Sequence, residues 1–529
     1  MNATEILRQM SNDLPNGVAI IDAYRGTPRT TTFSELDTAS QRVAGFFHHH
    51  GIGPGDAMLV FCPMSRELYV VLMALVRLGA VAVFLDPSAG KDHIERCCSM
   101  YPPKASISPP KAHLLRLLSP ALRKIPCKFS TTIPLPGAIP LKRANKAAPF
   151  STIEPVSEET PALITFTSGS TGEPKMVARS HGFLLAQHTV LQQTMGMQSG
   201  EIDLSTLPIV VLSNLASGAT SLIPNVDLRR PGDIDPEALY EQIVRHGPSS
   251  ATGAPSFLET LADFCIQKGY ELPGITKIFC GGAPVFPPLL RKLHKIAPAA
   301  NIIAVYGSTE AEPIADLCYS DISAEDMDKM TKGRGLLAGP PVDCIQLRII
   351  NDQWGTPLGP FSADDLTNTT LPPEAPGEIV VSGDHVLKEY MNGAGDRQTK
   401  FTVEGTTWHR TGDSGYLDDA GRLWLLGRCE AVHSDDRGDL YPFAVESAAQ
   451  LLPGIRRSAL VSEGGKRTLV VEPVANVQRI VCAAVKDELS WAQIDSVKIC
   501  ARIPVDKRHN SKIDYGALRQ ILDTLGAEV

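Results

Sequence analysis

The chain has 529 residues and a formal net charge of −8, and its composition is 43% hydrophobic and 20% charged. Such a length exceeds what one hydrophobic core usually supports, so we expect two or more domains. The composition is that of an ordinary globular protein, and the acidic net charge argues against nucleic acid as the main partner.

Targeting and metal-binding signals are weak. Residues 1–17 lack the apolar core of a secretory signal, and the most apolar run, residues 68–85, is interrupted by Arg77 and Gly79 and is too short for a convincing membrane span. The eleven cysteines show no CxxC spacing, which favours neither a disulfide framework nor a zinc site. We therefore expect a cytoplasmic protein without a membrane span.

The first part of the chain alternates between predicted helices and strands. A helix is expected to open with Thr32 or Ser34 as its cap. A strand over residues 57–61, a helix over residues 66–78 and a strand that starts at Val81 are expected to follow. Strand, helix and strand in this order predict a parallel sheet.

A strand over residues 163–166 runs into the loop Thr-Ser-Gly-Ser-Thr-Gly-Glu-Pro-Lys at residues 167–175. Its glycines allow a tight fold that points several N–H groups at one anion, and its hydroxyls and Lys175 would hold the phosphates of a nucleotide. Only two residues separate Gly169 from Gly172, so this is not a Walker loop. A plain polar turn is the alternative. After Pro174 the chain is predicted to form a helix, because four residues recur at helical spacing: His181, Leu184, Leu185 and His188.

Two further strands end in small or polar residues. One ends in Gly281, Gly282 and Ala283, for which a plain turn is the alternative. The other, residues 302–305, delivers five such residues at its carboxyl end, where open α/β sheets place their ligands: Tyr306, Gly307, Ser308, Thr309 and Glu310. The carboxylate of Glu310 is a hard oxygen ligand that suits Mg²⁺, whereas the alternative is an ordinary surface pair of Thr309 and Glu310.

Three later motifs complete the set: Thr411-Gly412-Asp413, Gly427-Arg428 and Asn510-Ser511-Lys512. Together the motifs resemble the adenylate-forming superfamily of acyl-CoA synthetases, peptide-synthetase adenylation domains and luciferases, and the similarity extends over essentially the whole chain. The resemblance implies an α/β fold with a large N-terminal domain of mixed sheets flanked by helices and a small mobile α+β C-terminal domain. It places the AMP-binding N-terminal domain at residues 1–427, the hinge at 428–430 and the mobile C-terminal domain at 431–529.

The resemblance also implies roles for single residues. Lys512, Thr309 and Glu310 would be catalytic, with Glu310 holding Mg²⁺, and Glu430 would take the hinge position. Lys507, in the same basic loop as Lys512, is the alternative catalytic lysine. The ATP-binding residues would be Thr167, Ser168, Gly169, Ser170, Thr171, Gly172, Lys175, Gly281, Gly282, Ala283, Tyr306, Gly307, Ser308, Asp413 and Arg428.

The implied reaction is attack of a carboxylate, from a fatty or 3-hydroxy fatty acid, on the α-phosphorus of Mg·ATP. Asp413 would bind the ribose hydroxyls with its two acceptor oxygens, and Tyr306 would stack on adenine. In acyl-CoA synthetases CoA then accepts the acyl group, and a glycine leaves room for its pantetheine arm. That position is Arg437 in this sequence.

Several stretches, such as residues 438–446 and 504–513, instead resemble the β-lactone synthetases of olefin biosynthesis. In those enzymes a 2-alkyl-3-hydroxy acid is adenylated and its own hydroxyl displaces AMP, which closes a four-membered lactone without CoA. Transfer to CoA is the main interpretation and lactone closure the alternative. A non-catalytic nucleotide-binding relative is disfavoured because all the motifs are present. The expected partner is a small-molecule carboxylic acid, and a homodimer is a candidate assembly. The run 209–212 is interpreted as an altered wall of the acyl pocket or as a buried strand.

Overall fold

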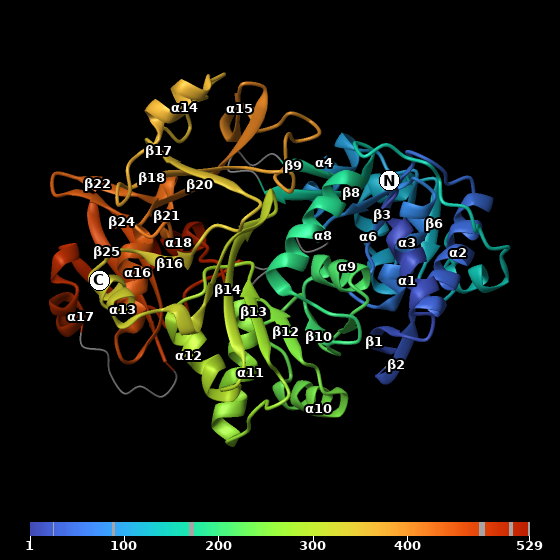
Figure 1. Ribbon diagram of the computed structural model, residues 1–529, viewed down its shortest axis with the longest axis horizontal. Coiled ribbons are helices and arrows are strands. Elements are labelled where there is room, and N and C mark those ends of the chain that lie inside the picture. Colours follow the sequence, from blue (N-terminus) through green and yellow to red (C-terminus); the bar gives the residue numbers. More distant parts are fainter. Residues whose placement is uncertain (25, 87–89, 169–173, 475–481, 507–510, 527–529) are drawn as a thin grey trace. The chain divides into compact units, whose positions relative to one another are not determined.

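The computed structural model describes residues 1–529 except 25, 87–89, 169–173, 475–481, 507–510 and 527–529 (Figure 1). The chain forms two compact units. The first contains Met1–Asn225, Arg245–Ser249 and Asp384–Arg397, and the second contains Val226–Val244, Ser250–Gly383 and Gln398–Val529. The predicted boundary at residues 428–430 lies inside the second unit and stays a prediction. The mixed α/β fold class is confirmed by several sheets flanked by helices.

The first unit contains a seven-stranded sheet in the order β7-β6-β5-β3-β4-β8-β9. All neighbouring strands are parallel except the antiparallel pair β8 and β9. The strands are β3 (Ala57–Val60), β4 (Val81–Phe84), β5 (Ala105–Ser108), β6 (Cys127–Ser130), β7 (Ile139–Pro140), β8 (Pro161–Ser168) and β9 (Pro174–Ser180). A second set of strands runs in the order β10-β11-β1-β2: β10 (Ile202–Ser205), β11 (Thr220–Leu222), β1 (Val18–Tyr24) and β2 (Thr27–Thr32).

Helices in the first 225 residues cover these strands and bury an apolar core around α2, α3 and β3. They are α1 (Thr4–Asp13), α2 (Phe33–His49), α3 (Arg66–Arg77), α4 (Lys91–Met100), α5 (Pro110–His113), α6 (Leu115–Leu118), α7 (Pro120–Lys124), η2 (Leu141–Lys146), α8 (His181–Met195) and α9 (Pro208–Ala216). The predicted cap of α2 is confirmed: Thr32 accepts a hydrogen bond from the Glu35 N–H, and Glu35 accepts one from the Thr32 N–H.

Two local predictions are corrected here. Residues 174–180 form strand β9, and the helix begins only at His181, because β9 pairs with β8 across the glycine loop. Residues 209–212 are not a strand but belong to helix α9, which begins at Pro208. Proline suits the first helical turn, where its missing N–H has no partner to lose.

The second unit carries strands in the order β15-β14-β13-β12: β12 (Ser250–Gly253), β13 (Lys277–Gly281), β14 (Asn301–Ser308) and β15 (Ala311–Cys318). A six-stranded sheet has the order β16-β21-β20-β18-β17, with β19 paired to β20. Its strands are β16 (Leu336–Gly339), β17 (Gln346–Ile350), β18 (Gly377–Ser382), β19 (Lys400–Val403), β20 (Thr406–Leu417) and β21 (Leu423–Arg428). Inside it, Arg410 and Glu378 form a fully buried bidentate ion pair.

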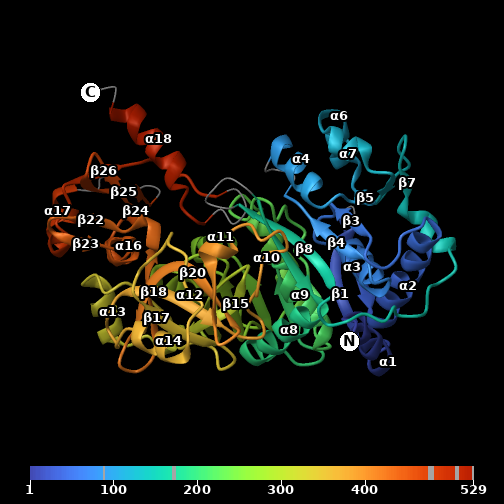
Figure 2. The same cartoon turned by 90° about the horizontal axis from the view of Figure 1, so that it is seen from above.

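The C-terminal part has cores of its own around a three-stranded sheet, β24-β25-β26 (Figure 2). The strands of that sheet are β24 (Ile455–Glu463), β25 (Lys466–Pro473) and β26 (Ser496–Ile499). Strands β22 (His433–Asp435) and β23 (Gly438–Leu440) form a separate two-stranded sheet. The helices after residue 225 are α10 (Pro236–His246), α11 (Pro255–Lys268), α12 (Pro287–Ile296), η3 (Tyr319–Asp321), α13 (Ala324–Thr331), α14 (Ala363–Thr369), α15 (Asp396–Thr399), η4 (Cys429–Ala431), α16 (Pro442–Leu451), α17 (Cys482–Glu488), η5 (Ser490–Ala492) and α18 (Tyr515–Gly526). None of the helices in the described part of the chain reaches the length and apolarity that a membrane crossing requires.

Candidate active site

The second unit brings together three predicted ATP-binding residues, Tyr306, Asp413 and Arg428. The Tyr306 hydroxyl donates a 2.7 Å hydrogen bond to Oδ2 of Asp413, and Arg428 donates one of 3.0 Å to Oδ1. Asp413 and Arg428 are direct neighbours on β20 and β21, whereas Tyr306 comes from β14 of another sheet. The Asp413 N–H donates to Oγ1 of Thr411 at 3.0 Å, which fixes the backbone of the motif.

The electrostatics of this trio favour one protonation state. Burial raises the pKa of the Tyr306 hydroxyl well above its usual value, and the Asp413 carboxylate raises it further. The same carboxylate raises the pKa of Arg428. The Tyr306 phenol is therefore neutral and the Arg428 guanidinium is charged at neutral pH. Asp413 accepts a donor on each oxygen, and its remaining lone pairs suit further hydroxyl donors.

Glycines at the edge of this unit have a structural reason that needs no ligand. A Cβ at Gly281 would lie 3.0 Å from the Val305 carbonyl oxygen on the neighbouring strand, and one at Gly307 would lie 3.0 Å from the Ala311 oxygen. Gly282 has a φ of +84°, a conformation that favours glycine. Packing therefore requires glycine at two of these positions, and backbone conformation favours it at the third. Ala283, which follows Gly282, is half-buried.

The predicted catalytic pair lies in a tight turn. Thr309 and Glu310 connect the antiparallel strands β14 and β15, and both are half-buried. The hydroxyl of Ser308 accepts the Glu310 N–H at 3.3 Å, which helps to shape the turn. Within the described residues, no cluster of three or more His, Cys, Asp or Glu side chains could hold a metal ion.

The first unit carries the predicted phosphate loop, of which Gly169, Ser170, Thr171 and Gly172 lie outside the described residues. Thr167 and Lys175 are paired across β8 and β9, and Ser168 is paired with Pro174 at the end of the hairpin. The Lys175 ammonium lies 5.2 Å from the centre of the Tyr390 ring. A Cβ at Gly395 would lie 2.6 Å from Cε of Lys175.

Sequence reasoning missed the segment that flanks Lys175. Met391 donates its N–H to the Met176 carbonyl at 2.9 Å, and Tyr390 packs with Leu387 and Val177. The contacts of Met391 with Met176 and of Tyr390 with Val177 join residues more than 200 positions apart, so no local sequence pattern predicts them. A cation over an aromatic face is attracted by the ring quadrupole, which makes Tyr390 a partner that orients the lysine.

Lys512 lies on a small loop of the C-terminal part. Asp506 donates its N–H to the Lys512 carbonyl at 2.8 Å and accepts the Lys512 N–H on Oδ1 at 2.9 Å. The Lys512 side chain is exposed, and the alternative lysine, Lys507, lies outside the described residues. Ser511 accepts a hydrogen bond of 3.2 Å from the Ser256 N–H at the start of α11. The predicted hinge residue, Glu430, is exposed in η4, directly after β21.

Arg437 is held in a network of charges. It contacts Asp435 at 2.6 Å and Asp495 at 2.9 Å. Asp435 also accepts from Arg467, a buried side chain, at 2.6 Å. These partners hold the pKa of both aspartates well below the usual value. The position where a CoA-dependent enzyme is expected to carry glycine is thus filled by an exposed arginine that is paired with two aspartates.

Comparison with known proteins shows the family and the fold of this chain. A family model described as AMP-binding enzyme matches residues 7–391. The olefin beta-lactone synthetase of Stenotrophomonas maltophilia is 31% identical over 521 residues, covering 94% of this chain and 91% of that protein. The 2-succinylbenzoate–CoA ligase of Enterococcus faecalis is 26% identical, covering 82% of this chain and 81% of that protein. Among solved structures, ATP-bound MatB from Rhodopseudomonas palustris has the same fold, with a TM-score of 0.79, 20% identity and coverage of 98% and 99%.

Proposed function

Because this chain belongs to the AMP-binding enzyme family and is an ATP-using, adenylate-forming ligase-type enzyme, we propose that it activates a fatty or 3-hydroxy fatty acid. The substrate carboxylate attacks the α-phosphorus of ATP and displaces pyrophosphate, which leaves an acyl-adenylate. The observation that carries the proposal is the contact of Tyr306 and Arg428 with Asp413, because it leaves a polar, oriented carboxylate suited to a ribose.

The proposed residue roles follow from charge and position. Lys512, exposed on its loop, would neutralise charge that develops between the carboxylate and the α-phosphate. Lys175 and the hydroxyl of Thr167, paired across the hairpin, would hold the outgoing pyrophosphate. Thr309 would contact the α-phosphate. The protein forms no covalent bond to the substrate in this step, so the rate acceleration would come from positioning the reactants and stabilising charge.

The donor set of this site fits Mg²⁺ when the phosphates of ATP supply the other ligands. Mg²⁺ is usually bound by one or two carboxylates together with the phosphates of the substrate and several waters. Glu310 with its neighbouring Thr309 hydroxyl offers such a partial set of hard oxygens. When bound, the ion would screen the phosphate charges, and Glu310 would hold it at the turn between β14 and β15.

For the second step we favour lactone closure. The 3-hydroxyl oxygen attacks the acyl carbon, the bond to AMP breaks, and the hydroxyl proton leaves, so that no second substrate is consumed. The ion-paired guanidinium of Arg437 and the likeness to the Stenotrophomonas maltophilia enzyme over nearly the whole chain support this choice. Acyl transfer to CoA is the competing second step, and the likeness to a CoA ligase supports it.

One assay tests both steps. Purified protein is incubated with Mg·ATP and a panel of fatty and 3-hydroxy fatty acids, with and without CoA, and products are identified by mass spectrometry alongside AMP and pyrophosphate. A product of acid mass minus water, formed without CoA and only from 3-hydroxy acids, is the expected result. A thioester that appears only with CoA contradicts lactone closure, and absence of pyrophosphate from every acid contradicts adenylation.

The catalytic lysine has its own test. Lys512→Ala is expected to retain ATP binding and to lose nearly all pyrophosphate release, with Lys466→Ala as the control at an exposed lysine of the same part of the chain. Near-normal release from Lys512→Ala would reject this residue. For location we propose the cytoplasm, since all eleven cysteines are free thiols.

A further inference from the structure

A long stretch of the first unit carries only positive charge. Residues 96–153 contain ten Lys and Arg residues, whereas all 58 Asp and Glu residues of the chain lie outside this stretch. The chain as a whole has a net charge of −8, so this stretch runs against the general trend. A concentration of positive charge on an otherwise acidic protein attracts an anionic partner. Helices α5, α6 and α7 belong to this stretch.

Helix α6 exposes leucines in the middle of this positive stretch. Its sequence is Leu-Arg-Leu-Leu, and none of its four residues is buried. Leu117 and Leu118 are 73% and 64% exposed, and Leu114, directly before the helix, is 63% exposed. Single exposed hydrophobic side chains are common on protein surfaces, but three within five residues form a patch that is stabilised when it leaves water. We call Leu114, Leu117 and Leu118 the leucine patch.

Contacts on the opposite side of these helices hold the leucine patch outward. Nε2 of the buried His113 lies 3.0 Å from the carbonyl oxygen of Phe129. Leu122 of α7 is buried in an apolar core of the first unit. The Arg116 guanidinium donates a hydrogen bond of 3.1 Å to the Pro136 carbonyl. The three helices are therefore anchored without the leucine patch, which remains in contact with solvent.

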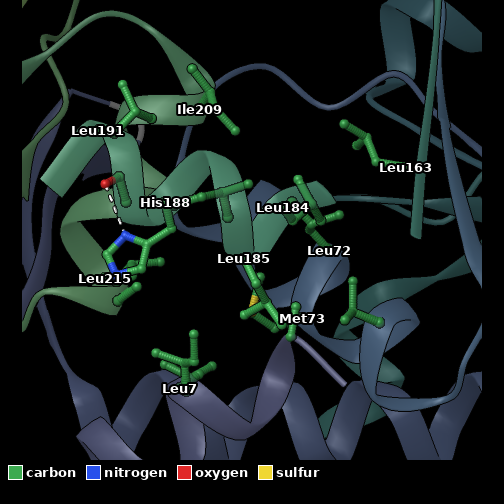
Figure 3. Close-up of a pocket in the computed structure, with 16 residues that line it drawn as sticks. Leu7, Leu72, Met73, Leu163, Leu184, Leu185, His188, Leu191, Ile209 and Leu215 are labelled. Atoms are coloured by element: carbon green, nitrogen blue, oxygen red, sulfur yellow. Dashed lines mark hydrogen bonds between the residues drawn. The ribbon is translucent and has the colours of Figure 1, made fainter. Parts of the chain in front are cut away.

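Other leucines of the first unit line an internal surface. A cavity beside β8 is lined by apolar residues of α1, α3, α8 and α9, among them Leu7, Leu72 and Leu184 (Figure 3). Its wall also contains His188, whose Nδ1 lies 3.1 Å from Oγ of Ser213, as the dashed line marks. Packing between elements accounts for these leucines, whereas it does not account for the leucine patch.

Cationic side chains lie on the same helices as the leucine patch. Lys111 is exposed on α5, three residues before Leu114, and residues at this spacing share a helix face. Arg123 is exposed on α7. Glu95 of α4 is an acidic group that borders these helices, and its carboxylate accepts the Ala121 N–H at 3.2 Å. Leucines and cations are thus interspersed along helices at the edge of the first unit (Figure 2).

We propose that helices α5, α6 and α7 dock on a membrane surface that contains anionic lipids. The leucine patch enters the boundary between headgroups and acyl chains, while Lys111 and Arg123 stay among the lipid phosphates. A second copy of the chain fits less well, because a symmetric contact brings the same cations face to face. The inference goes beyond the proposed function, since it concerns where the enzyme is held and not which acid it activates.

Cosedimentation with lipid vesicles tests the proposal without ATP or acid, so its result is independent of the proposed function. Vesicles of phosphatidylcholine and phosphatidylglycerol in equal parts are compared with vesicles of phosphatidylcholine alone. Leu117→Gln combined with Leu118→Gln removes apolar surface, and Val244→Gln, at a 64% exposed position of α10, is its control. Lys111→Glu reverses a charge, and Lys466→Glu, also at an exposed position, is its control. Melting temperatures check that each variant is folded.

The wild type is expected to sediment with the mixed vesicles only, and added salt should weaken the binding. The double leucine variant should lower the partition coefficient roughly tenfold or more, because buried leucine surface is lost. Lys111→Glu should lower it roughly fivefold or more. Both controls should bind like the wild type.

Three results overturn the proposal: no binding to either kind of vesicle, equal binding to both kinds, or binding like the wild type by a folded leucine or lysine variant. The oligomeric state is measured by size-exclusion chromatography in the absence of lipid. A dimer that the double leucine variant loses assigns the leucine patch to a second copy of the chain, which also overturns the proposal.

Discussion

Glu446, on helix α16, is a buried carboxylate without a cationic partner among the described residues. Its Oε1 accepts hydrogen bonds from the Tyr515 hydroxyl at 2.7 Å and from the Leu460 N–H at 2.9 Å. Its Oε2 is buried and makes no hydrogen bond within the described part of the chain. Burial raises the pKa of this carboxyl from 4.5 to about 7.

The stability effect has a definite sign. The unfolded chain titrates at the ordinary value of 4.5, whereas the folded chain keeps its proton until about pH 7. The protonated carboxyl therefore stabilises the fold fully below pH 4.5, and this contribution is lost as the pH rises towards 7. The difference between the two pKa values corresponds to about 3 kcal/mol, as an upper estimate for a fully buried group.

We predict that Glu446→Gln removes this pH dependence. The assay is hydrogen exchange of the peptides containing β24 and α18, corrected for intrinsic rates, because local opening can be followed even where global unfolding is not two-state. Between pH 4.5 and 8, protection of these peptides in the wild type should fall relative to the variant by about two orders of magnitude. Glu488→Gln, at an exposed position of α17, is the control. A wild-type to variant difference that does not change with pH would refute the reasoning.

Three further outcomes are expected. Asp413→Asn removes the negative charge beside Arg428 and weakens the hydrogen bond from Tyr306. Because hydrogen bonds to charged groups contribute about 1.5–3 kcal/mol, the KM for ATP should rise roughly tenfold or more in the pyrophosphate assay. An unchanged KM would speak against ribose binding by Asp413. Gly395→Leu should displace the Lys175 side chain, because the added Cβ would lie 2.6 Å from its Cε, and should reduce ATP turnover while circular dichroism stays unchanged. Arg437→Gly should permit some thioester formation with CoA, and a variant that still yields only lactone shows that other residues block that route.

The local elements that could be predicted are those whose signals lie within a few residues. The capping box at Thr32 and the strand–helix–strand run from Ala57 to Phe84 needed only local patterns. The periodicity of the aliphatic run at 209–212 did not predict its helix, because periodicity cannot distinguish a short buried strand from a helix. Pro208 was the available signal, since proline is favoured at a first helical position.

The site shows the same division between local and distant information. Asp413 and Arg428 could be named from their motifs, and the structure joins them to Tyr306 by hydrogen bonds. Tyr390 could not be predicted as a site residue, because it contributes through a contact with Lys175, which is far away in the sequence. The cavity beside β8 was equally hidden, since its walls come from four helices whose relative placement no local pattern specifies.

The proposed second step depends in part on the ion pairs that hold Arg437. Asp435 is shared between Arg437 and the buried Arg467, and Asp495 binds Arg437 while also accepting the Arg467 N–H at 2.7 Å. Two aspartates and two arginines thus form one charge network, in which Arg467 is buried while Arg437 and Asp495 are exposed. Under the proposed lactone closure this network is compatible with catalysis, because no pantetheine arm has to pass it.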